Sequence, residues 1–332
     1  MKMILEKAEM DRFLQVLSRD YKVFGPKRKG LGYVFGEIGG VEELCLDYRS
    51  TILPPKKFFH PPREVLFNFK VEDGWSLEVP EIRDKILLLG VHSCDLNAIL
   101  RLDKLFSEDI EDPYYLRRRE NSFIVALNCT SPGENCFCLS LGTGPFIEEG
   151  YDLLLTDLGD RYLLETGSSE GERLLEGAGF KEARDEDLAR KEERRREAEA
   201  LFKKYMEFEG LAEIVRKSLD HPIWKELAEE GVGDMRPCLS CGNCSLVCPT
   251  CYCFEVMDDV DISLKEGSRV RELDSCQLFE YAEMALDTNP RRDRKDRIRH
   301  WMSCKFGAAG GGVLSSCVGC GRSVSYTHLT LP

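Results

Sequence analysis

The stretch that decides the fold is Cys238-Leu-Ser-Cys241-Gly-Asn-Cys244-Ser-Leu-Val-Cys248-Pro249-Thr-Cys251-Tyr-Cys253. Its first part has the spacing C-x2-C-x2-C-x3-C-P, which is typical of a [4Fe–4S] cluster-binding motif. The two-residue gaps let three thiolates converge on one cluster while the backbone wraps around it. A zinc site is the main alternative, but zinc knuckles place two C-x2-C pairs well apart. Unrelated core thiols explain the pattern less well, because the glycine and the proline also stand where such a motif requires them.

A second motif begins downstream at Cys317-Val-Gly-Cys320 and then departs from the pattern. Ser323 stands at the third ligand position and Thr327 at the fourth. The tail matches no part of the motif, so we expect residues 323–332 to be non-native. We expect the natural sequence to carry cysteine at positions 323 and 327, and the natural full-length protein to hold two [4Fe–4S] clusters.

Composition narrows the class of protein. The chain has 332 residues, enough for two domains. Its formal charge of −13 argues against a nucleic-acid partner. Charged residues interrupt the first residues of the chain, which therefore lack the apolar segment of a signal peptide. No apolar run is long enough to span a membrane. Fifteen cysteines in such a chain favour metal ligation in a reducing cytoplasm, so we expect a cytoplasmic location.

The N-terminal part predicts a mixed α/β domain over residues 1–180. Residues 85–91 form an apolar run of strand length, and a helical pattern over residues 96–106 follows. A second strand is expected over 122–128, and a β-hairpin over 151–165. The fold class expected for the whole chain is α+β.

Four cysteines of this domain lie close to predicted strand ends: Cys94, Cys129, Cys136 and Cys138. Ligand sites in open α/β sheets lie at the carboxyl ends of strands, so these four could hold a third cluster. Cys94 would also lie near a helix N-terminus, where a thiolate is favoured. The alternative is that they are buried or free thiols, since cysteine is often buried. No dinucleotide fingerprint follows a strand here.

The rest of the chain predicts a charged helical linker over residues 181–230 and a mostly helical, ferredoxin-like dicluster domain over 231–322, with a helical insert over 254–310. The basic segment 291–300 is expected to be a solvated helix, or else a docking patch for an acidic partner. In residues 51–69, proline pairs predict an ordered loop that packs aromatic side chains, or else a docking surface. The four extra cysteines have packing as their default role, although Cys251 and Cys253 are close enough to the first motif to shield a cluster or contact its shell. The four are Cys251, Cys253, Cys276 and Cys304.

Taken together, the motifs resemble a known family. They are Gly90-Val-His-Ser-Cys-Asp95, Asn128-Cys-Thr130 with Cys136-Phe-Cys138 and Gly144-Pro145, the run from Cys238 to Cys253, Arg269-Val-Arg-Glu-Leu-Asp-Ser-Cys276, and Cys317-Val-Gly-Cys320-Gly-Arg322. The chain resembles the beta subunit of cytosolic NiFe hydrogenases (sulfhydrogenases) and the A subunit of anaerobic sulfite reductase, almost to Arg322. The resemblance implies an electron-transfer subunit between a flavin subunit that handles NAD(P)H and a catalytic hydrogenase or sulfite reductase subunit. It also implies crossed ligation, which spacing does not prove. Cys238, Cys241 and Cys244 would hold one cluster, and Cys248 would join Cys317 and Cys320 at the other.

The sequence therefore favours a redox relay with no evident catalytic site of its own. The alternative is a self-contained redox enzyme that binds substrate or flavin in the N-terminal domain near Cys94. A zinc-stabilised scaffold is a third interpretation.

Overall fold

The computed structural model describes residues 1–332 apart from 72–73, 109, 208, 232–236, 308–315 and 329–332. The chain divides into two compact units that alternate along the sequence. Unit 1 comprises Met1–Phe59, Arg83–Met206 and Val318–Pro332, and unit 2 comprises His60–Ile82 and Glu207–Cys317. This division differs from the boundaries expected from sequence, because residues 60–82 and the segment after Cys317 each join a unit that is remote from them along the chain.

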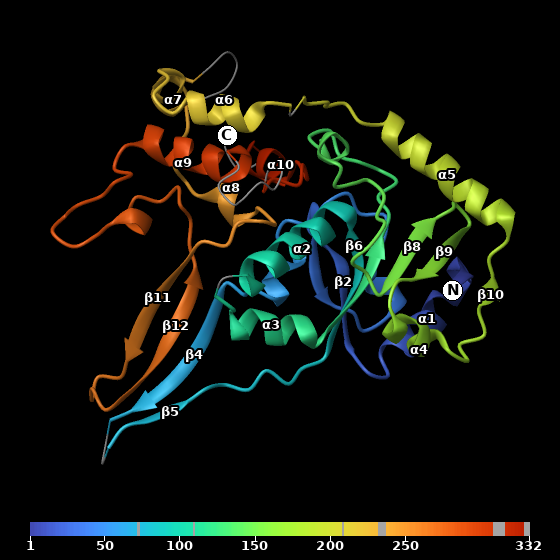
Figure 1. The fold of residues 1–332 in the computed structure, drawn as a ribbon. Helices are drawn as coiled ribbons and strands as arrows, with labels where there is room; N and C mark the ends of the chain where they lie inside the picture. The colour runs from blue at the N-terminus through green and yellow to red at the C-terminus, as the bar shows by residue number, and fades with distance from the viewer. Residues whose placement is uncertain (72–73, 109, 208, 232–236, 308–315, 329–332) are drawn as a thin grey trace. The chain divides into compact units, whose positions relative to one another are not determined.

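Unit 1 is built on an eight-stranded sheet with the order β10-β1-β9-β8-β7-β6-β2-β3 (Figure 1). In that order the strands are Lys181–Glu182, Lys2–Glu6, Arg161–Thr166, Leu153–Asp157, Ser122–Leu127, Ile86–His92, Lys22–Lys29 and Gly32–Glu37. The central strands β8, β7, β6 and β2 are parallel, and antiparallel strands flank them. Helices α2 (Ser93–Ser107) and α3 (Pro113–Glu120) form the long crossover from β6 to β7 that parallel pairing requires. The expected α+β class is confirmed.

The central strands explain the position of the cysteines that follow them. Residues 87–89 of β6 are fully buried, as is typical of parallel strands covered on both faces. The register places His92 at the end of β6 opposite Leu127 at the end of β7. The chain therefore leaves both strands at the same edge of the sheet, just before Cys94 and Cys129.

The antiparallel part of the sheet has different partners on its two faces. Met3 and Leu5 of β1 belong to the main core, together with Phe13 of helix α1 (Met10–Leu17). Ile4 points to the opposite face, because side chains alternate along a strand. There it lies in a small apolar cluster against which Leu188 of helix α5 (Asp185–Ala200) packs.

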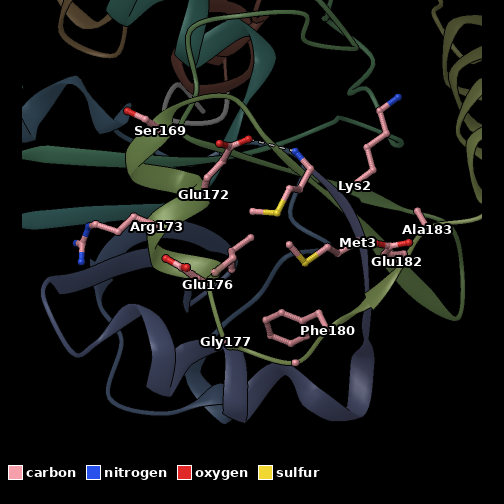
Figure 2. A pocket seen from close by; sticks show the side chains of 13 residues that line it. Lys2, Met3, Ser169, Glu172, Arg173, Glu176, Gly177, Phe180, Glu182 and Ala183 are labelled. Atoms are coloured by element: carbon pink, nitrogen blue, oxygen red, sulfur yellow. Dashed lines mark hydrogen bonds and ion pairs between the residues drawn. The ribbon is translucent and has the colours of Figure 1, made fainter.

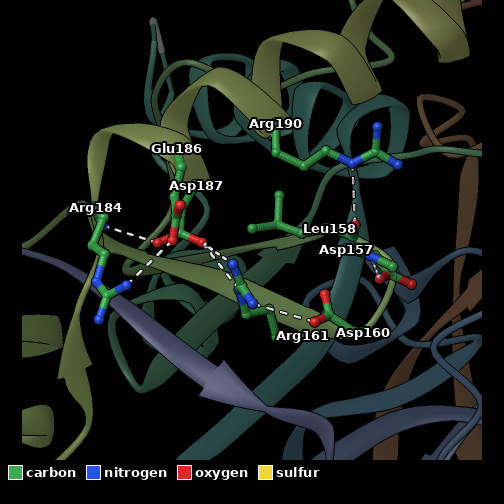
Figure 3. A network of polar contacts seen from close by, with 9 residues as sticks. Asp157, Leu158, Asp160, Arg161, Arg184, Glu186, Asp187 and Arg190 are labelled. Atoms are coloured by element: carbon green, nitrogen blue, oxygen red, sulfur yellow. Dashed lines mark hydrogen bonds and ion pairs between the residues drawn. The ribbon is translucent and has the colours of Figure 1, made fainter.

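Polar contacts fasten the start of α5 to the β8–β9 hairpin (Figure 3). The Asp187 carboxylate accepts hydrogen bonds from the Arg184 N–H at 2.9 Å and from the Arg161 Nη2 at 2.8 Å. Arg190 Nε donates to the Leu158 carbonyl at 3.4 Å. The helix expected to be a linker is thus part of unit 1, because its charged side chains reach carboxylates and backbone of the hairpin.

Unit 2 contains an antiparallel sheet with the order β11-β12-β4-β5. These strands are Phe254–Val260, Glu266–Leu273, Arg63–Lys70 and Ser76–Glu78. The helical insert expected over residues 254–310 is therefore corrected, since its first part is the β11–β12 hairpin. Cross-strand ion pairs such as Arg269–Asp258, at 2.8 Å, contribute to the pairing of these two strands. A strand is normally predicted from alternating apolar residues, and here charged residues obscure that pattern. The hairpin's partner strand β4 comes from far upstream, and the buried pair of Arg271 and Glu64 spans 207 positions.

The helices of unit 2 are short apart from α9. They are α6 (Leu211–Lys217), α7 (Ile223–Lys225), α8 (Asn243–Leu246) and α9 (Arg294–Phe306), whereas α10 (Arg322–His328) belongs to unit 1. The proline-rich stretch contains a 3-10 turn over Pro55–Phe58, and Phe59 after it is fully buried, in keeping with an ordered, packed loop. In the described part of the chain, no helix has both the length and the apolar composition that crossing a membrane requires.

Candidate iron–sulfur sites

The first cysteine motif lies in unit 2, with Cys238 and Cys241 on a loop, Cys244 within α8 and Cys248 just after it. Ser240 and Gly242 have positive φ angles of 54° and 78°, so the backbone curls around the motif. The Ser240 N–H donates a hydrogen bond to Cys238 Sγ at 3.4 Å. Arg294 of α9 holds the loop from outside, because its Nη1 donates to the Cys238 carbonyl at 2.9 Å. The basic segment is thus not merely solvated, and Arg297 within it is 5% exposed.

The four thiols of this motif lie near one another. Burial raises the pKa of the Cys244 thiol to about 12, and the charges of Cys238, Cys248 and Cys241 contribute to the rise. The other three thiols are therefore near enough to Cys244 to affect its pKa, and their role as cluster ligands stays a prediction. No group of three or more His, Cys, Asp or Glu among the described residues is arranged to hold a metal ion, so the structure shows proximity of these thiols and no coordination geometry.

A buried lysine lies beside the fourth cysteine of the motif. Lys305 of α9 is 1% exposed and donates a hydrogen bond to Thr250 Oγ1 at 2.9 Å. Burial alone would lower its pKa, but the charges of Cys248, Cys251 and Cys304 outweigh burial and raise the pKa well above its ordinary value. A buried cation needs negative charge nearby, and thiolates can supply that charge here.

Two further cysteines form a pair next to the motif. A hydrogen bond between Cys253 and Cys276 lowers the pKa of the Cys253 thiol and raises that of Cys276. Cys244 also raises the pKa of Cys276, which places this pair beside the first motif. Cys253 and Cys276 of unit 2 are therefore close to the first motif, and Cys276 is also buried.

The second motif spans the boundary between the two units. Cys317 is the last residue of unit 2, and Ser316 before it donates a hydrogen bond to the Cys304 carbonyl at 2.6 Å. Cys320 belongs to unit 1. The structure thus assigns the two cysteines of this motif to different units, although the sequence groups them.

The unit 1 part of the second motif lies along residues 135–138. The Phe137 N–H donates to the Gly319 carbonyl at 2.9 Å. The Cys136 thiol donates to the Cys320 carbonyl at 3.6 Å. Cys320 is therefore next to two of the four cysteines for which a third cluster was considered, Cys136 and Cys138.

Glycine is required at two positions of this contact. Gly319 and Gly321 have φ angles of 62° and 66°. A Cβ at Gly319 would lie 2.6 Å from the Cys138 nitrogen, and one at Gly321 would lie 2.5 Å from the Asn135 oxygen. The glycines of the second motif therefore permit a backbone approach that no other residue type would allow.

Arg322 anchors the same segment. Its side chain is 1% exposed and donates two parallel hydrogen bonds of 2.9 Å to the carboxylate of Asp95, near the start of α2. Its Nε donates to the Thr51 carbonyl at 2.8 Å. Such two-pronged pairs are strong and geometrically specific.

The four N-terminal cysteines gather at the carboxyl edge of the parallel strands. Burial raises the pKa of the Cys94 thiol, and the nearby charges that raise it further include those of Cys320 and Cys138. Burial likewise raises the pKa of Cys138, with contributions from Cys136, Cys129 and Cys320. Five thiols of unit 1 are therefore close neighbours, and Cys320 is the one that sequence reasoning did not place there.

A hollow of about 890 Å³ lies between β1 and helix α4 (Ser169–Leu175) of unit 1 (Figure 2). Its lining combines apolar Met3 and Phe180 with charged Glu172 and Arg173, and the N-terminal ammonium lies 3.5 Å from Glu172. No cysteine lines the hollow. It therefore gives no support to a substrate or flavin site near Cys94.

Comparison with known proteins now fixes the family. Residues 237–330 match the sequence model of the family described as "4Fe-4S dicluster domain". Over 314 residues the chain is 41% identical to sulfhydrogenase 2 subunit beta of Pyrococcus furiosus, a match that covers 93% of this chain and 89% of that protein. The chain belongs to the sulfhydrogenase beta-subunit family. The resemblance drawn from the motifs is confirmed, and no solved structure matches the chain significantly.

The residues of this beta-subunit family member fit the clusters that a dicluster domain implies. Iron–sulfur clusters take thiolate ligands, and the first motif presents four clustered thiols on a loop shaped by positive φ angles. The buried Lys305 suits an anionic group beside Cys248. The second motif fits in part, because Ser323 stands at its third ligand position.

Sequence reasoning missed two residues of these sites. Lys305 lies near the end of the charged helix α9 and belongs to no sequence motif. Its role becomes visible only in the structure, where Cys248, Cys251 and Cys304 lie near it. In the sequence, Arg322 stood out only as the last residue of the segment that resembles the family. Its partner Asp95 is 227 positions away, and no local pattern connects them.

Proposed function

We propose that this chain is the iron–sulfur electron-transfer subunit of a multisubunit cytoplasmic oxidoreductase. It relays electrons between a flavin subunit that handles NAD(P)H and a hydrogenase or sulfite reductase catalytic subunit. The observation that carries the proposal is the gathering of Cys238, Cys241, Cys244 and Cys248 within a domain of the dicluster family. The relative's name as a subunit beta supports assembly with further subunits.

The chain's own residues would hold the clusters and set their environment. Cys238, Cys241 and Cys244 are proposed ligands of one [4Fe–4S] cluster, and Cys248, Cys317 and Cys320 of the other. A bound cluster supplies reversible one-electron exchange. Hydrogen bonds to the sulfurs and nearby positive charge favour the reduced state, which are the contributions expected from the Ser240 N–H and from Lys305.

The test compares the isolated chain with a two-cysteine variant. Anaerobic reconstitution of the isolated chain should give brown protein with iron and sulfide, and electron paramagnetic resonance signals after reduction. Cys238→Ser with Cys241→Ser should remove one set of those signals. The isolated chain should not oxidise NADH or NADPH by itself. Zinc in place of iron, or steady NAD(P)H oxidation by the chain alone, would overturn the proposal.

A further inference from the structure

We propose that Cys94, Cys129, Cys136 and Cys138 hold a third iron–sulfur cluster in unit 1. The metal content of this site stands by itself, whereas its part in electron relay rests on the function proposed above. The four ligands are all present in the sequence, unlike those of the second motif. All four cysteines belong to unit 1.

Two of the ligands are positioned by the sheet. Cys94 and Cys129 follow β6 and β7, whose last residues His92 and Leu127 are paired in register. The carboxyl edge of parallel strands is where open α/β sheets bind ligands. Cys94 also lies in the first turn of α2, a helix of 15 residues that follows β6 directly.

The other two ligands lie on a loop whose two ends are tied together. The Cys129 N–H donates to the Pro145 carbonyl at 3.1 Å, and the Thr143 N–H donates to the Cys138 carbonyl at 3.0 Å. The Thr143 hydroxyl donates to the Val318 carbonyl at 2.9 Å. These bonds hold the loop that carries Cys136 and Cys138 back over the strand ends.

An orphan hydroxyl points to a ligand at this place. Ser93 is 1% exposed, and within the described part of the chain its Oγ has no hydrogen-bond partner. A Cβ added at Gly144 would collide with Ser93 Oγ and would lie 3.1 Å from Cys138 Sγ. The Ser93 hydroxyl therefore packs against the backbone of Gly144, close to the Cys138 thiol, and this packing requires that residue 144 has no side chain. A cluster sulfide or a ligating thiolate would accept the hydrogen bond that Ser93 lacks.

The surrounding charge suits an anionic cluster. Arg322 lies near both Cys94 and Cys136, and Arg49 also lies near Cys136. The charge of Arg322 is already paired with the Asp95 carboxylate, which also lies near Cys94 and Cys136. Arg49 is therefore the cation that would offset part of the negative charge of an iron–sulfur cube.

The contact with Cys320 gives the third site a neighbour in the relay. Cys320 is a proposed ligand of the second-motif cluster and lies beside Cys136 and Cys138. A single electron would pass between these two sites, reducing one by one electron as the other is oxidised, with no bond made or broken. The third site would thus lie next to the part of the second motif that belongs to unit 1.

The decisive experiment counts iron in anaerobically reconstituted full-length chain. Cys136→Ser with Cys138→Ser should lose about four iron atoms per chain, the content of one cube. Cys45→Ser, a control in unit 1 outside the cysteine group, should lose none. Cys238→Ser with Cys241→Ser should remove different signals and leave those of unit 1, so failure of the two proposals can be told apart. If the double variant does not fold, Cys129→Ser alone is measured in the same way. Iron content equal to that of the unmodified chain, or zinc in unit 1, would overturn the proposal.

A second readout tests the orphan hydroxyl. Ser93→Ala should retain all the iron, but the unit 1 cluster should become harder to reduce, because a hydrogen bond to a cluster sulfur stabilises the reduced state. Its midpoint potential, followed by electron paramagnetic resonance, should therefore move to more negative values. Unchanged potentials for every cluster of Ser93→Ala would contradict the placement of the cluster next to Ser93.

Discussion

At the scale of single residues, the first prediction concerns how the buried ion pair of Arg322 and Asp95 affects the free energy of unfolding. Both side chains are 1% exposed, so removal of either leaves an uncompensated buried charge. Arg322→Met should therefore lower the free energy of unfolding by about 3–5 kcal/mol. Lys217→Met, which breaks an exposed pair with Glu213, should cost about 0.5 kcal/mol or less. Urea unfolding measures both variants, and equal midpoints would contradict this account.

The second prediction at this scale concerns Lys305. Its buried positive charge beside Cys248 should favour the reduced state of an adjacent cluster. Lys305→Met should move that cluster's midpoint potential negative by roughly 50–100 mV, from the Coulomb energy of one charge several ångström away at an effective dielectric constant of about 20. Lys305→Arg keeps the charge and serves as the control. A redox titration in which both variants match the unmodified chain would show that Lys305 only packs.

At the scale of elements, the start of α5 depends on Asp187. Burial would raise the pKa of this carboxyl, but hydrogen bonds from the Arg184 N–H and the Arg161 guanidinium outweigh burial and lower it. A lowered acid pKa stabilises the fold above the unfolded-state value of about 3.9, and this contribution is lost as the pH falls below it.

Asp187→Asn should therefore destabilise unit 1 by about 1–2 kcal/mol at neutral pH, as loss of a helix cap does. The difference from the unmodified chain should shrink as the pH is lowered towards 3. Asp185→Asn, in the same first turn but exposed, should have only a small effect. Urea midpoints at several pH values measure both, and a difference that does not change with pH would contradict the role given to the carboxylate.

The contact between the second motif and residues 135–138 gives a further prediction. Gly319→Ala adds a Cβ 2.6 Å from the Cys138 nitrogen at a φ of 62°, so both steric overlap and backbone strain oppose it. It should cost about 2–4 kcal/mol in total. Gly30→Ala has a similar φ of 59° but nothing within 4 Å, so it should cost only about 1 kcal/mol. Hydrogen exchange at the Phe137 N–H, which donates to Gly319, should accelerate in the first variant alone.

Comparison of particular elements shows what sequence can and cannot predict here. Strands β6 and β7 were predictable because parallel strands buried on both faces read as continuous apolar runs. The α+β class followed from such runs, and the family from the resemblance of the N-terminal and cysteine motifs to known proteins. The β11–β12 hairpin was not predictable, because its cross-strand ion pairs disguise the alternation and its partner β4 is far upstream. The placement of Cys320 in unit 1 was hidden for the same reason, since its anchors Arg322 and Asp95 meet only in the fold.

At the scale of the whole molecule, the chain passes from unit 1 to unit 2 and back more than once. Residues 60–82 leave unit 1 for unit 2, and the chain returns to unit 1 after Cys317. The last return carries half of the second cysteine motif. The second motif is therefore incomplete in either unit alone, which makes the whole chain the object to measure.

The last prediction restores the motif itself. Positions 323 and 327 fall in α10 and are the third and fourth positions of the second C-x2-C-x2-C-x3-C spacing. Ser323→Cys with Thr327→Cys would supply the third ligand of the second motif and the crossed fourth ligand of the first, in the pattern of two-cluster ferredoxins. Reconstituted protein should gain several iron atoms per chain and become more resistant to air. Ser323→Cys with Ser325→Cys adds as many thiols but leaves position 327 without a cysteine, so it should supply at most one of the two missing ligands. Equal iron in the two variants would contradict the assignment of the missing ligands to positions 323 and 327.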